Sequence, residues 1–362
     1  MSARLGWFAV SLAPWLWRHV RRLDDEGAAS LPGASAKSLG AALGVDQKTA
    51  EAAARSFSNE TLAEKLAGLE CRGLRVLTRA DAGFPDSLRA IYDPPAALYC
   101  RGDFEDGAPS IALVGSRRAT PSGKIVAAEM AAELAAAGVT VVSGLARGID
   151  GAAHRGALRT GKTWAVLGNG LDQIYPPEHR KLAEDIVRDG AVLSEYPPGT
   201  PPKPLHFPAR NRLISGLSQA VVIVEAAARS GALITADFAL EHGREVFAVP
   251  GPVRSRASVG CHRLLQQGAG LVTGAADVIE ALELLGGHLP GSAEVCPAHK
   301  SGGGSSLTSS QHELLESIPF EPTSLDDIVG HGKSDHILST LTELELEGHV
   351  ARCDRGAYCR LK

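Results

Sequence analysis

From Ile111 onward, short apolar runs rich in β-branched residues alternate with longer runs that have helical spacing. Continuous apolar strands that alternate with helices are typical of a parallel sheet covered on both faces. We therefore predict an α/β fold with a Rossmann-like, doubly wound and mostly parallel sheet. The predicted strands are 111–115 (IALVG), 139–144 (VTVVSG), 164–168 (WAVLG), 191–195 (AVLSE), 220–226 (AVVIVEA), 245–251 (EVFAVPG) and 270–274 (GLVTG).

The predicted sheet belongs to a longer chain of 362 residues, which is more than one ordinary domain. Residues 1–70 carry Leu, Ala and Trp at helical spacing and predict a helical unit of the SAM or helix-hairpin-helix kind. Its Leu-Pro-Gly turn allows two interpretations, a contact with DNA backbone or, as we favour, a plain turn between packed helices. Residues 71–285 form the predicted sheet domain, in which 74–108 reads as an extension packed onto the sheet.

Periodicity is lost over residues 286–306, where Gly and Ser dominate, and this composition predicts a flexible linker. Residues 307–362 resemble a winged helix, a unit that often reads duplex DNA through one helix. From Ser306 onward, however, ten Asp and Glu face five Lys and Arg, a net charge of −5 that repels phosphate. We therefore favour a protein partner for this unit over duplex DNA.

The whole chain has a formal net charge of −4 and a calculated pI near 6.3, so any polyanion must be held by local basic patches. Six cysteines without a C-x-x-C pair favour neither a zinc site nor a disulfide scaffold, and a reducing cytoplasm is the expected compartment. The opening segment (residues 1–22) is apolar but contains a proline, and most of its charged residues come after the apolar run and not before it. We interpret it as a packed helix, with no membrane partner.

The sequence does not support either of two common nucleotide-binding signatures. Residues 156–163 (GALRTGKT) match the P-loop pattern, but a P-loop needs a strand before the first glycine and a helix after the lysine. Here the preceding residues are helical and the following ones form a predicted strand. The dinucleotide pattern G-x-G-x-x-G follows none of the predicted strands. We expect no cofactor and no metal.

Polar, glycine-containing turns follow the first two strands of the predicted sheet. Gly115 permits a tight turn, Ser116 can donate to an anion, and Arg117 projects over the strand ends; the alternative is a solvated loop. The second turn has further candidate anion donors. They are Ser143, Gly144 and Gly148.

Three acidic or basic side chains near these turns support a rival interpretation, an enzyme that acts on a nucleotide or nucleoside in the same strand-end pocket. Asp150 and His154 share one helix face and would suit acid-base chemistry, although an aspartate bonded to amides at a helix start is the favoured alternative. Glu225 ends a predicted strand. The segment after it, RSGALITADFA, departs from the P-G-G-x-G-T-x-x-E pattern of nucleotide-hydrolysing proteins of this fold class.

The segment 203–212 (KPLHFPARNR) holds three Lys and Arg, a His and a Phe, and no acid. Cationic side chains neutralise phosphates, and an exposed aromatic ring stacks on a base. The combination favours single-stranded nucleic acid, because a paired base offers no free face. The alternative is structural: Phe207 belongs to the core, and Arg210 or Arg212 pairs with Glu225.

Together, these stretches resemble the DNA-processing protein A (DprA, or Smf) family over residues 74–285. The motifs are VGSRRATPSG, VVSGLARGIDGAAHRGAL, AVLGNGLDQIYPPEH, LSEYPPGTPP, the stretch from HFPARNR to AVPGP, and GCHRLLQQGA. The resemblance implies a single-stranded DNA-binding recombination mediator that protects incoming strands in natural transformation. It also implies a RecA partner loaded past single-strand-binding protein, a homodimer, and no catalytic activity or nucleotide cofactor.

The resemblance also implies site residues. Arg117, Arg210, Asn211 and Arg212 should meet phosphates, and Phe207 should meet a base. Two positions depart from the family pattern. The lysine upstream of the phenylalanine appears as Lys203 with a proline after it, and Cys261-His262 stands where an Asn is usual. We expect dimer and recombinase contacts on this last helix, around Leu264 and Leu265.

Overall fold

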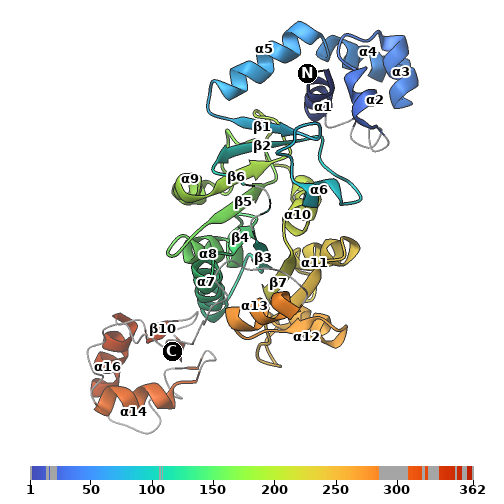
Figure 1. The fold of residues 1–362 in the computed structure, drawn as a ribbon. Helices are drawn as coiled ribbons and strands as arrows, with labels where there is room; N and C mark the ends of the chain where they lie inside the picture. Colours follow the sequence, from blue (N-terminus) through green and yellow to red (C-terminus); the bar gives the residue numbers. More distant parts are fainter. Residues whose placement is uncertain are drawn as a thin grey trace.

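The computed structural model describes residues 2–13, 16, 23–105, 107, 109–284, 309–319, 323–324, 334–346, 349–352 and 357–360. A nine-stranded sheet organises its larger part (Figure 1). The strands are β1 (Arg75–Thr78), β2 (Ala97–Gly102), β3 (Ser110–Gly115), β4 (Thr140–Ser143), β5 (Thr163–Leu167), β6 (Ala191–Ser194), β7 (Ala220–Glu225), β8 (Glu245–Ala248) and β9 (Gly270–Leu271).

The strand order is β1-β2-β6-β5-β4-β3-β7-β8-β9. The seven strands from β6 to β9 along this order pair in parallel, which confirms the predicted mostly parallel sheet. From β3 the chain first builds outward through β4, β5 and β6 and then returns to place β7 on the other side of β3. Ligands of such sheets bind where the order reverses, outside the carboxyl ends of the strands. Here that point lies between β3 and β7.

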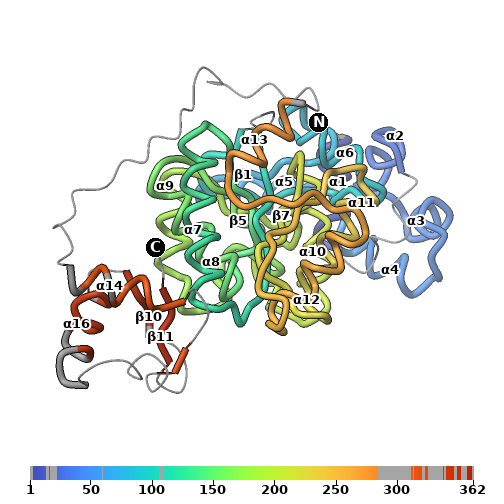
Figure 2. Tube along the Cα trace, turned by 90° about the horizontal axis from the view of Figure 1, so that it is seen from below, coloured from blue at the N-terminus to red at the C-terminus, as the bar shows by residue number. Residues whose placement is uncertain are grey.

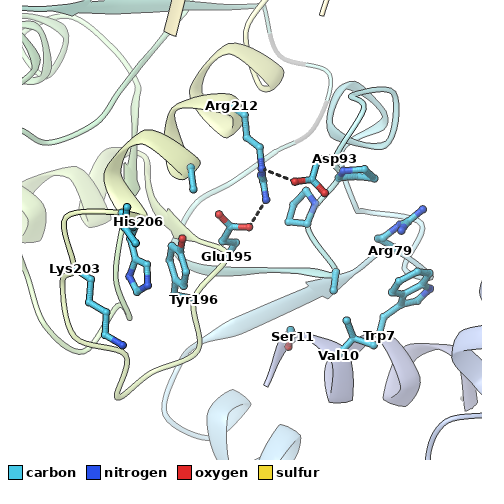
Figure 3. Close-up of a pocket in the computed structure, with 15 residues that line it drawn as sticks. Trp7, Val10, Ser11, Arg79, Asp93, Glu195, Tyr196, Lys203, His206 and Arg212 are labelled. Carbon is cyan, nitrogen blue, oxygen red and sulfur yellow. Dashed lines mark hydrogen bonds and ion pairs between the residues drawn. The ribbon is translucent and has the colours of Figure 1, made fainter. Parts of the chain in front are cut away.

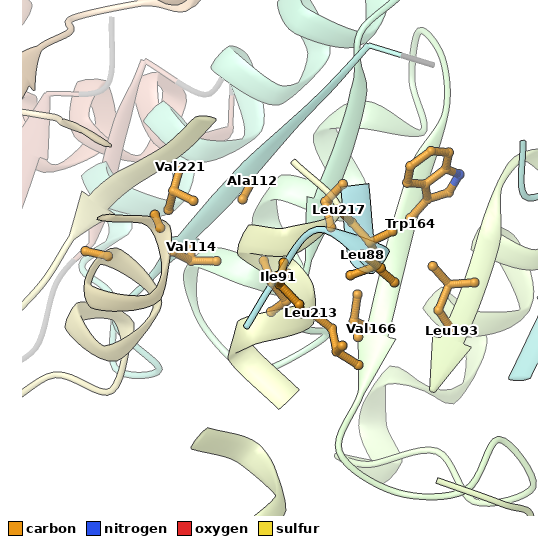
Figure 4. Packing of buried hydrophobic residues seen from close by; sticks show 14 of the residues in the cluster. Leu88, Ile91, Ala112, Val114, Trp164, Val166, Leu193, Leu213, Leu217 and Val221 are labelled. Atoms are coloured by element: carbon orange, nitrogen blue, oxygen red, sulfur yellow. The ribbon is translucent and has the colours of Figure 1, made fainter. Parts of the chain in front are cut away.

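Helices cover both faces of the sheet because alternate residues of each buried strand point to opposite sides. Ile111 and Leu113 pack under α7 (Pro121–Ala136), α8 (Ile149–Ala157) and α13 (Ala275–Leu284). Ala112 and Val114 face the other side, where Leu213 of α10 (His206–Gly216) belongs to their cluster (Figure 4). The same cluster includes residues of α6 (Asp86–Arg89), α11 (Ala232–Glu241) and α12 (Val259–Gln266).

The extension predicted at 74–108 adds β1 and β2 to the sheet as antiparallel strands next to β6. In the described part of residues 2–70, the helices α1 to α5 lie at this end of the molecule (Figures 1 and 2). All of them except α2 share a hydrophobic cluster with β1, β2, β5, β6 and α9 (Arg180–Asp189), and a 2.7 Å hydrogen bond joins the hydroxyls of Ser11 and Tyr99. The helices are α1 (Ser2–Ser11), α2 (Asp25–Ala29), α3 (Ala36–Leu43), α4 (Gln47–Ser56) and α5 (Asn59–Glu70).

The Leu-Pro-Gly turn of this helical unit is closed internally. Gly33 has a φ of 75°, in the left-handed region that favours glycine, and its amide donates to the Phe57 carbonyl at 2.7 Å. An amide engaged in this way is not offered to a DNA phosphate. Gly33 is thus used inside the helical unit, as expected for a turn between packed helices, which stays our favoured interpretation.

The C-terminal unit has its own small core around Leu315, Leu341 and Val350. It contains α14 (Ser309–Ser317), α16 (Ser334–Leu346) and an antiparallel pair formed by β10 (Val350–Arg352) and β11 (Tyr358–Arg360). Helices followed by a two-stranded ribbon agree with the predicted winged helix. The predicted linker 286–306 lies outside the described residues, and the domain boundaries remain predictions.

The rejected P-loop pattern indeed lies in the reverse context, since α8 precedes it and β5 follows it. A Cβ on Gly156 would lie 2.0 Å from the Ala128 carbonyl oxygen, so this glycine permits the close packing of α8 on α7. Lys162 pairs with Asp103 at 2.9 Å, next to the amino end of β5. In the described part of the chain, no helix is long and apolar enough to cross a membrane.

Candidate nucleic-acid interface

A cleft of about 920 Å³ opens at the carboxyl ends of the strands, where the sheet order reverses. We call it the strand-end cleft. Its walls come from the loop after β3, the start of α8, the first turns of α10, the start of α11, and the loop after β8. Four arginines but one carboxylate line it, which makes a local cationic surface on an acidic chain. These charged residues are Arg117, Arg118, Asp150, Arg210 and Arg256.

Arg117 and Phe207 form the centre of the strand-end cleft. The Arg117 guanidinium lies over the Phe207 ring, with Cζ 5.2 Å from the ring centroid. Tyr175 contacts the same ring at a centroid distance of 5.5 Å and an interplanar angle of 40°. A Cβ on Gly168 would lie 3.1 Å from the Phe207 ring, so glycine at the end of β5 lets the ring approach closely. The segment 203–212 is thus brought to the first strand turn.

The turn after β3 is shaped by packing as well as by chemistry. A Cβ on Gly115 would lie 2.6 Å from Ile149, so the sheet and α8 meet too closely for any other residue. The Ser116 amide donates to the Glu225 carbonyl at 2.7 Å and is therefore not free for an anion. The Ser116 hydroxyl lines the cleft and accepts from the Arg118 amide at 3.1 Å. Arg117 and Arg118 are exposed.

Two of the three expected donors of the second turn are used inside the protein, contrary to the expectation that they bind an anion. The Ser143 hydroxyl donates to the Leu113 carbonyl at 2.6 Å, and the Gly144 amide donates to Asp150 at 3.2 Å. Gly148 has a φ of 78° and lies against the Ser116 carbonyl, where a Cβ would come within 2.1 Å. The Asp150 carboxylate thus accepts from the Gly144 amide, which the prediction assigned to a ligand anion.

Arg210 lies beneath the strand-end cleft with 2% of its surface exposed. Its guanidinium donates to the Gly144 carbonyl at 2.8 Å and to the Val166 carbonyl. Burial lowers its pKa to about 10, while the nearby Asp150 charge acts in the opposite direction. These bonds tie α10 to the ends of β4 and β5. Arg210 therefore supports the floor of the cleft, and we do not retain it as a primary phosphate ligand.

Two other predicted residues lie away from the cleft. Arg212 is buried on the opposite face of α10, where it pairs with Glu195 and, at 3.5 Å, with Asp93. The alternative prediction that Arg212 pairs with Glu225 is wrong, because the Glu225 carboxylate accepts from Thr120 instead. Lys203 is exposed and lines a different pocket. We therefore remove Arg212 and Lys203 from the cleft.

Asn211 does lie in the strand-end cleft, as expected. Its side-chain amide donates to the Gly231 carbonyl at 3.3 Å, and its side-chain oxygen accepts from Arg210 at 3.3 Å. Among the charged and aromatic side chains that line the cleft, three escaped the sequence prediction: Tyr175, Arg118 and Arg256. Each stands in a loop, where periodicity carries no signal, although Tyr175 lies in the family-like stretch IYPPEH and is 40% exposed.

The three groups of the rival enzyme interpretation have structural partners. Asp150 accepts from the Gly144 and Ala146 amides, and burial raises its pKa. His154 is bonded at both ring nitrogens, to Thr163 at 2.7 Å and to the Leu145 amide at 3.3 Å, and burial lowers its pKa to about 3. This confirms the favoured interpretation of Asp150 as an amide-bonded aspartate at a helix start.

Glu225 has an internal role as well. Its carboxylate accepts from the Thr120 amide and hydroxyl at the start of α7, and a Cβ on Gly123 would lie 2.1 Å from it. It thus occupies the helix terminus that would otherwise attract a phosphate. Across the described residues, no group of three or more His, Cys, Asp or Glu side chains is placed to hold a metal ion.

Sequence comparisons agree with this geometry. The family model of DNA recombination-mediator protein A matches residues 75–283, and that of the DprA winged helix domain matches residues 300–354. The chain is 39% identical over 312 residues to protein Smf of Escherichia coli K12, covering 85% of this chain and 83% of that protein. It is 46% identical over 205 residues to DNA processing protein DprA of Streptococcus pneumoniae R6, covering 56% and 72% respectively.

Solved structures give the same result. DNA processing protein A from S. pneumoniae superposes with a TM-score of 0.63 and 34% identity, covering 75% of this chain and 97% of that one. The protein from Helicobacter pylori, whose structure concerns its single-stranded DNA binding mode, gives a TM-score of 0.54 and 33% identity, covering 59% and 97%. With a family model that matches more than half of its length and a relative aligned over most of it, this chain belongs to the DNA recombination-mediator protein A family.

Proposed function

We propose that this protein binds single-stranded DNA in the strand-end cleft and acts as a recombination mediator. The observation that carries the proposal is the placement of Arg117 over Phe207, beside Tyr175, in a cleft lined by three exposed arginines. A guanidinium neutralises phosphate, and the accessible faces of aromatic rings, here the exposed Tyr175 and the half-buried Phe207, offer stacking surfaces that are sequence-tolerant. The H. pylori relative binds single-stranded DNA, which supports the same ligand here.

Each cleft residue has a proposed task. Arg117, Arg118 and Arg256 are exposed and contact the phosphates. Phe207 stacks on a base, and Asn211 and the Ser116 hydroxyl supply polar contacts. Gly115, Ser143, Gly144 and Gly148 shape the cleft instead of binding DNA themselves, and Arg210 holds its floor. Compared with the expected site, Arg117, Phe207, Asn211 and Ser116 keep their contacts with DNA, and the other predicted residues do not.

The rival proposal, an enzyme acting on a nucleotide in the same cleft, is disfavoured by the chemistry of its candidate groups. A general base must reach a substrate proton in a suitable protonation state. Asp150, His154 and Glu225 are all buried, and each is engaged by backbone or hydroxyl groups. The mediator function needs none of them to be free, and family membership favours it.

The finer parts of the proposed function rest on the family. We propose that the protein protects incoming strands in natural transformation and loads RecA past single-strand-binding protein as a homodimer. The expected dimer residue Leu264 is 7% exposed and belongs to the sheet core, so it does not offer a contact surface. Leu265, which is half-buried on the same helix, keeps that role in the proposal.

Fluorescence anisotropy of labelled oligonucleotides tests the DNA site. We expect tight, salt-sensitive binding to a single strand and weak binding to a duplex of the same length. Equal affinity for the two would contradict the proposal. Loading is tested separately, by adding the protein to RecA and to single strands covered with single-strand-binding protein. Joint-molecule formation should rise with wild type, and no stimulation would restrict the function to strand binding.

A further inference from the structure

A second cavity, of about 380 Å³, lies on the other side of α10. We call it the α1–α10 pocket. Its walls come from α1, the segment 93–96 before β2, residues 195 and 196 after β6, and the start of α10 (Figure 3). Its volume falls in the usual range of small-ligand sites, which begins at roughly 300 Å³.

Helix α10 separates this pocket from the strand-end cleft and presents one face to each. His206, Ala209 and Arg212, at helical spacing, line the α1–α10 pocket. Phe207, Arg210 and their neighbours one turn on line the strand-end cleft. Consecutive residues His206 and Phe207 therefore serve different cavities. A strand bound at Phe207 would need to pass only the first turn of α10 to reach the second pocket.

The polar side of the α1–α10 pocket carries unused hydrogen-bonding capacity. Arg212 pairs with Glu195 and Asp93 there, as the dashed lines of Figure 3 show. Among the described residues, Glu195 Oε1 and Arg212 Nη1 are buried and have no hydrogen-bond partner. Buried polar atoms without partners are costly and rare. A ligand that offers N–H donors to the carboxylate and an acceptor to the guanidinium would satisfy both.

The other sides of the pocket suit a flat, aromatic ligand. On one side the Arg79 guanidinium covers Trp7, with Cζ 4.1 Å from the ring centroid. On the opposite side the rings of Tyr196 and His206 are stacked at 4.2 Å, with the exposed Lys203 beyond them (Figure 3). Nucleobases stack on arginine planes and aromatic rings, and a lysine at the rim can neutralise the attached phosphate.

We propose that the α1–α10 pocket binds a nucleobase that carries an exocyclic amino group. Such a base brings N–H donors to Glu195, whereas thymine lacks this group. Two sources share this chemistry. One is the neighbouring base of a strand held at Phe207, and this source depends on the proposed function. The other is a free nucleotide, and its binding does not depend on the proposed function. The site also gives Lys203 a role, since its side chain lines this pocket instead of the strand-end cleft.

The first arm of the test uses short oligothymidylates in which a single deoxyguanosine is moved along the strand. Anisotropy with wild type should show one position where deoxyguanosine binds about fivefold more tightly than thymidine. Ala209→Met fills the pocket without removing a charge and should abolish this preference while leaving oligothymidylate binding unchanged. Ala276→Met, at an exposed position of α13, is the matched control and should retain it. Glu195→Gln removes the acceptor charge and should reduce the preference.

The second arm titrates deoxyguanosine monophosphate and thymidine monophosphate into wild type and Ala209→Met by calorimetry. A free nucleotide is the ligand if wild type binds the guanine nucleotide selectively, Ala209→Met abolishes that binding, and the first arm shows no effect of position. A position effect alone would identify the strand. Absence of both, or effects that persist in Ala209→Met, would overturn the proposal. If oligothymidylate itself does not bind, the proposed function fails, and the second arm still decides the pocket.

Discussion

The guanidinium of Arg117 lies over the ring of Phe207, although ninety positions of sequence separate the two residues. Arg117 follows β3, the first strand of the parallel part of the sheet, and Phe207 lies in the first turn of α10. The pair joins a phosphate-neutralising group to a base-stacking surface at the point where the strand order reverses. Most of the proposed function depends on this contact.

Phe207→Ala should weaken single-stranded DNA binding by about 1 to 3 kcal/mol, the usual contribution of one stacked base. The ring also supports Tyr175, so the loss should lie toward the upper end of this range. Phe207→Tyr keeps the stacking face and should bind nearly as well as wild type. Anisotropy titrations at fixed salt measure both, and an alanine variant with wild-type affinity would remove Phe207 from the interface.

Arg117→Ala should reduce the dependence of binding on salt. Each phosphate neutralised on a single strand contributes roughly 0.7 to the slope of log affinity against log salt concentration. We therefore expect a slope smaller by about that amount, measured over a salt series. Arg188→Ala, an exposed arginine on α9 that does not line the cleft, is the control and should leave the slope unchanged. Equal slopes for wild type and Arg117→Ala would contradict the phosphate contact.

Arg210→Met should destabilise the fold more than it alters the DNA contact itself. The substitution removes two bonds to backbone carbonyls and leaves the buried Asp150 without its nearby positive charge. Breaking a buried charged interaction typically costs roughly 3 to 5 kcal/mol. Chemical denaturation measures the loss. Arg118→Met, at an exposed position, should change stability by less than about 0.5 kcal/mol and weaken DNA binding instead.

His154 should make the protein less stable in acid. Burial lowers the pKa of His154 to about 3, whereas in the unfolded chain it titrates near its ordinary value of 6.5. Its contribution is therefore complete above pH 6.5 and is lost as pH falls toward 3, at up to about 1.4 kcal/mol per pH unit. Denaturation at a series of pH values should show a shallower acid loss for His154→Asn. Parallel pH profiles for the two proteins would show that the imidazole is not held neutral.

Gly156→Ala tests the packing origin of the P-loop-like pattern. The new Cβ would approach the Ala128 backbone oxygen to 2.0 Å, and forcing α8 away from α7 should cost about 1 to 3 kcal/mol. Gly68→Ala, at a position in α5 with open space around the Cβ, should instead stabilise by roughly 0.5 to 1 kcal/mol. Thermal melts compare the two.

Lys162→Ala should not change the affinity of the protein for nucleotides. A loss of ATP affinity in this variant would indicate that the pattern at residues 156–163 acts as a P-loop.

The sequence by itself determined the elements, because their signals are local. The seven apolar runs correspond to β3–β9, and the order of strands and helices made the parallel sheet predictable. Reverse context around Lys162 was enough to exclude a P-loop. The motifs from VGSRRATPSG to GCHRLLQQGA indicated the family, which the comparisons confirm.

Only the tertiary structure decided which of the basic residues are available. Arg210 and Arg212 stand two positions apart in one segment, yet both are buried, and they point to different cavities on opposite faces of α10. Their partners come from β5, from the residues that follow β4 and β6, and from the segment before β2, all of them outside α10. Whether an arginine is free to bind phosphate depends on whether the fold places carbonyls or carboxylates against it. Those partners are set by how distant segments pack, and a local sequence pattern does not contain that information.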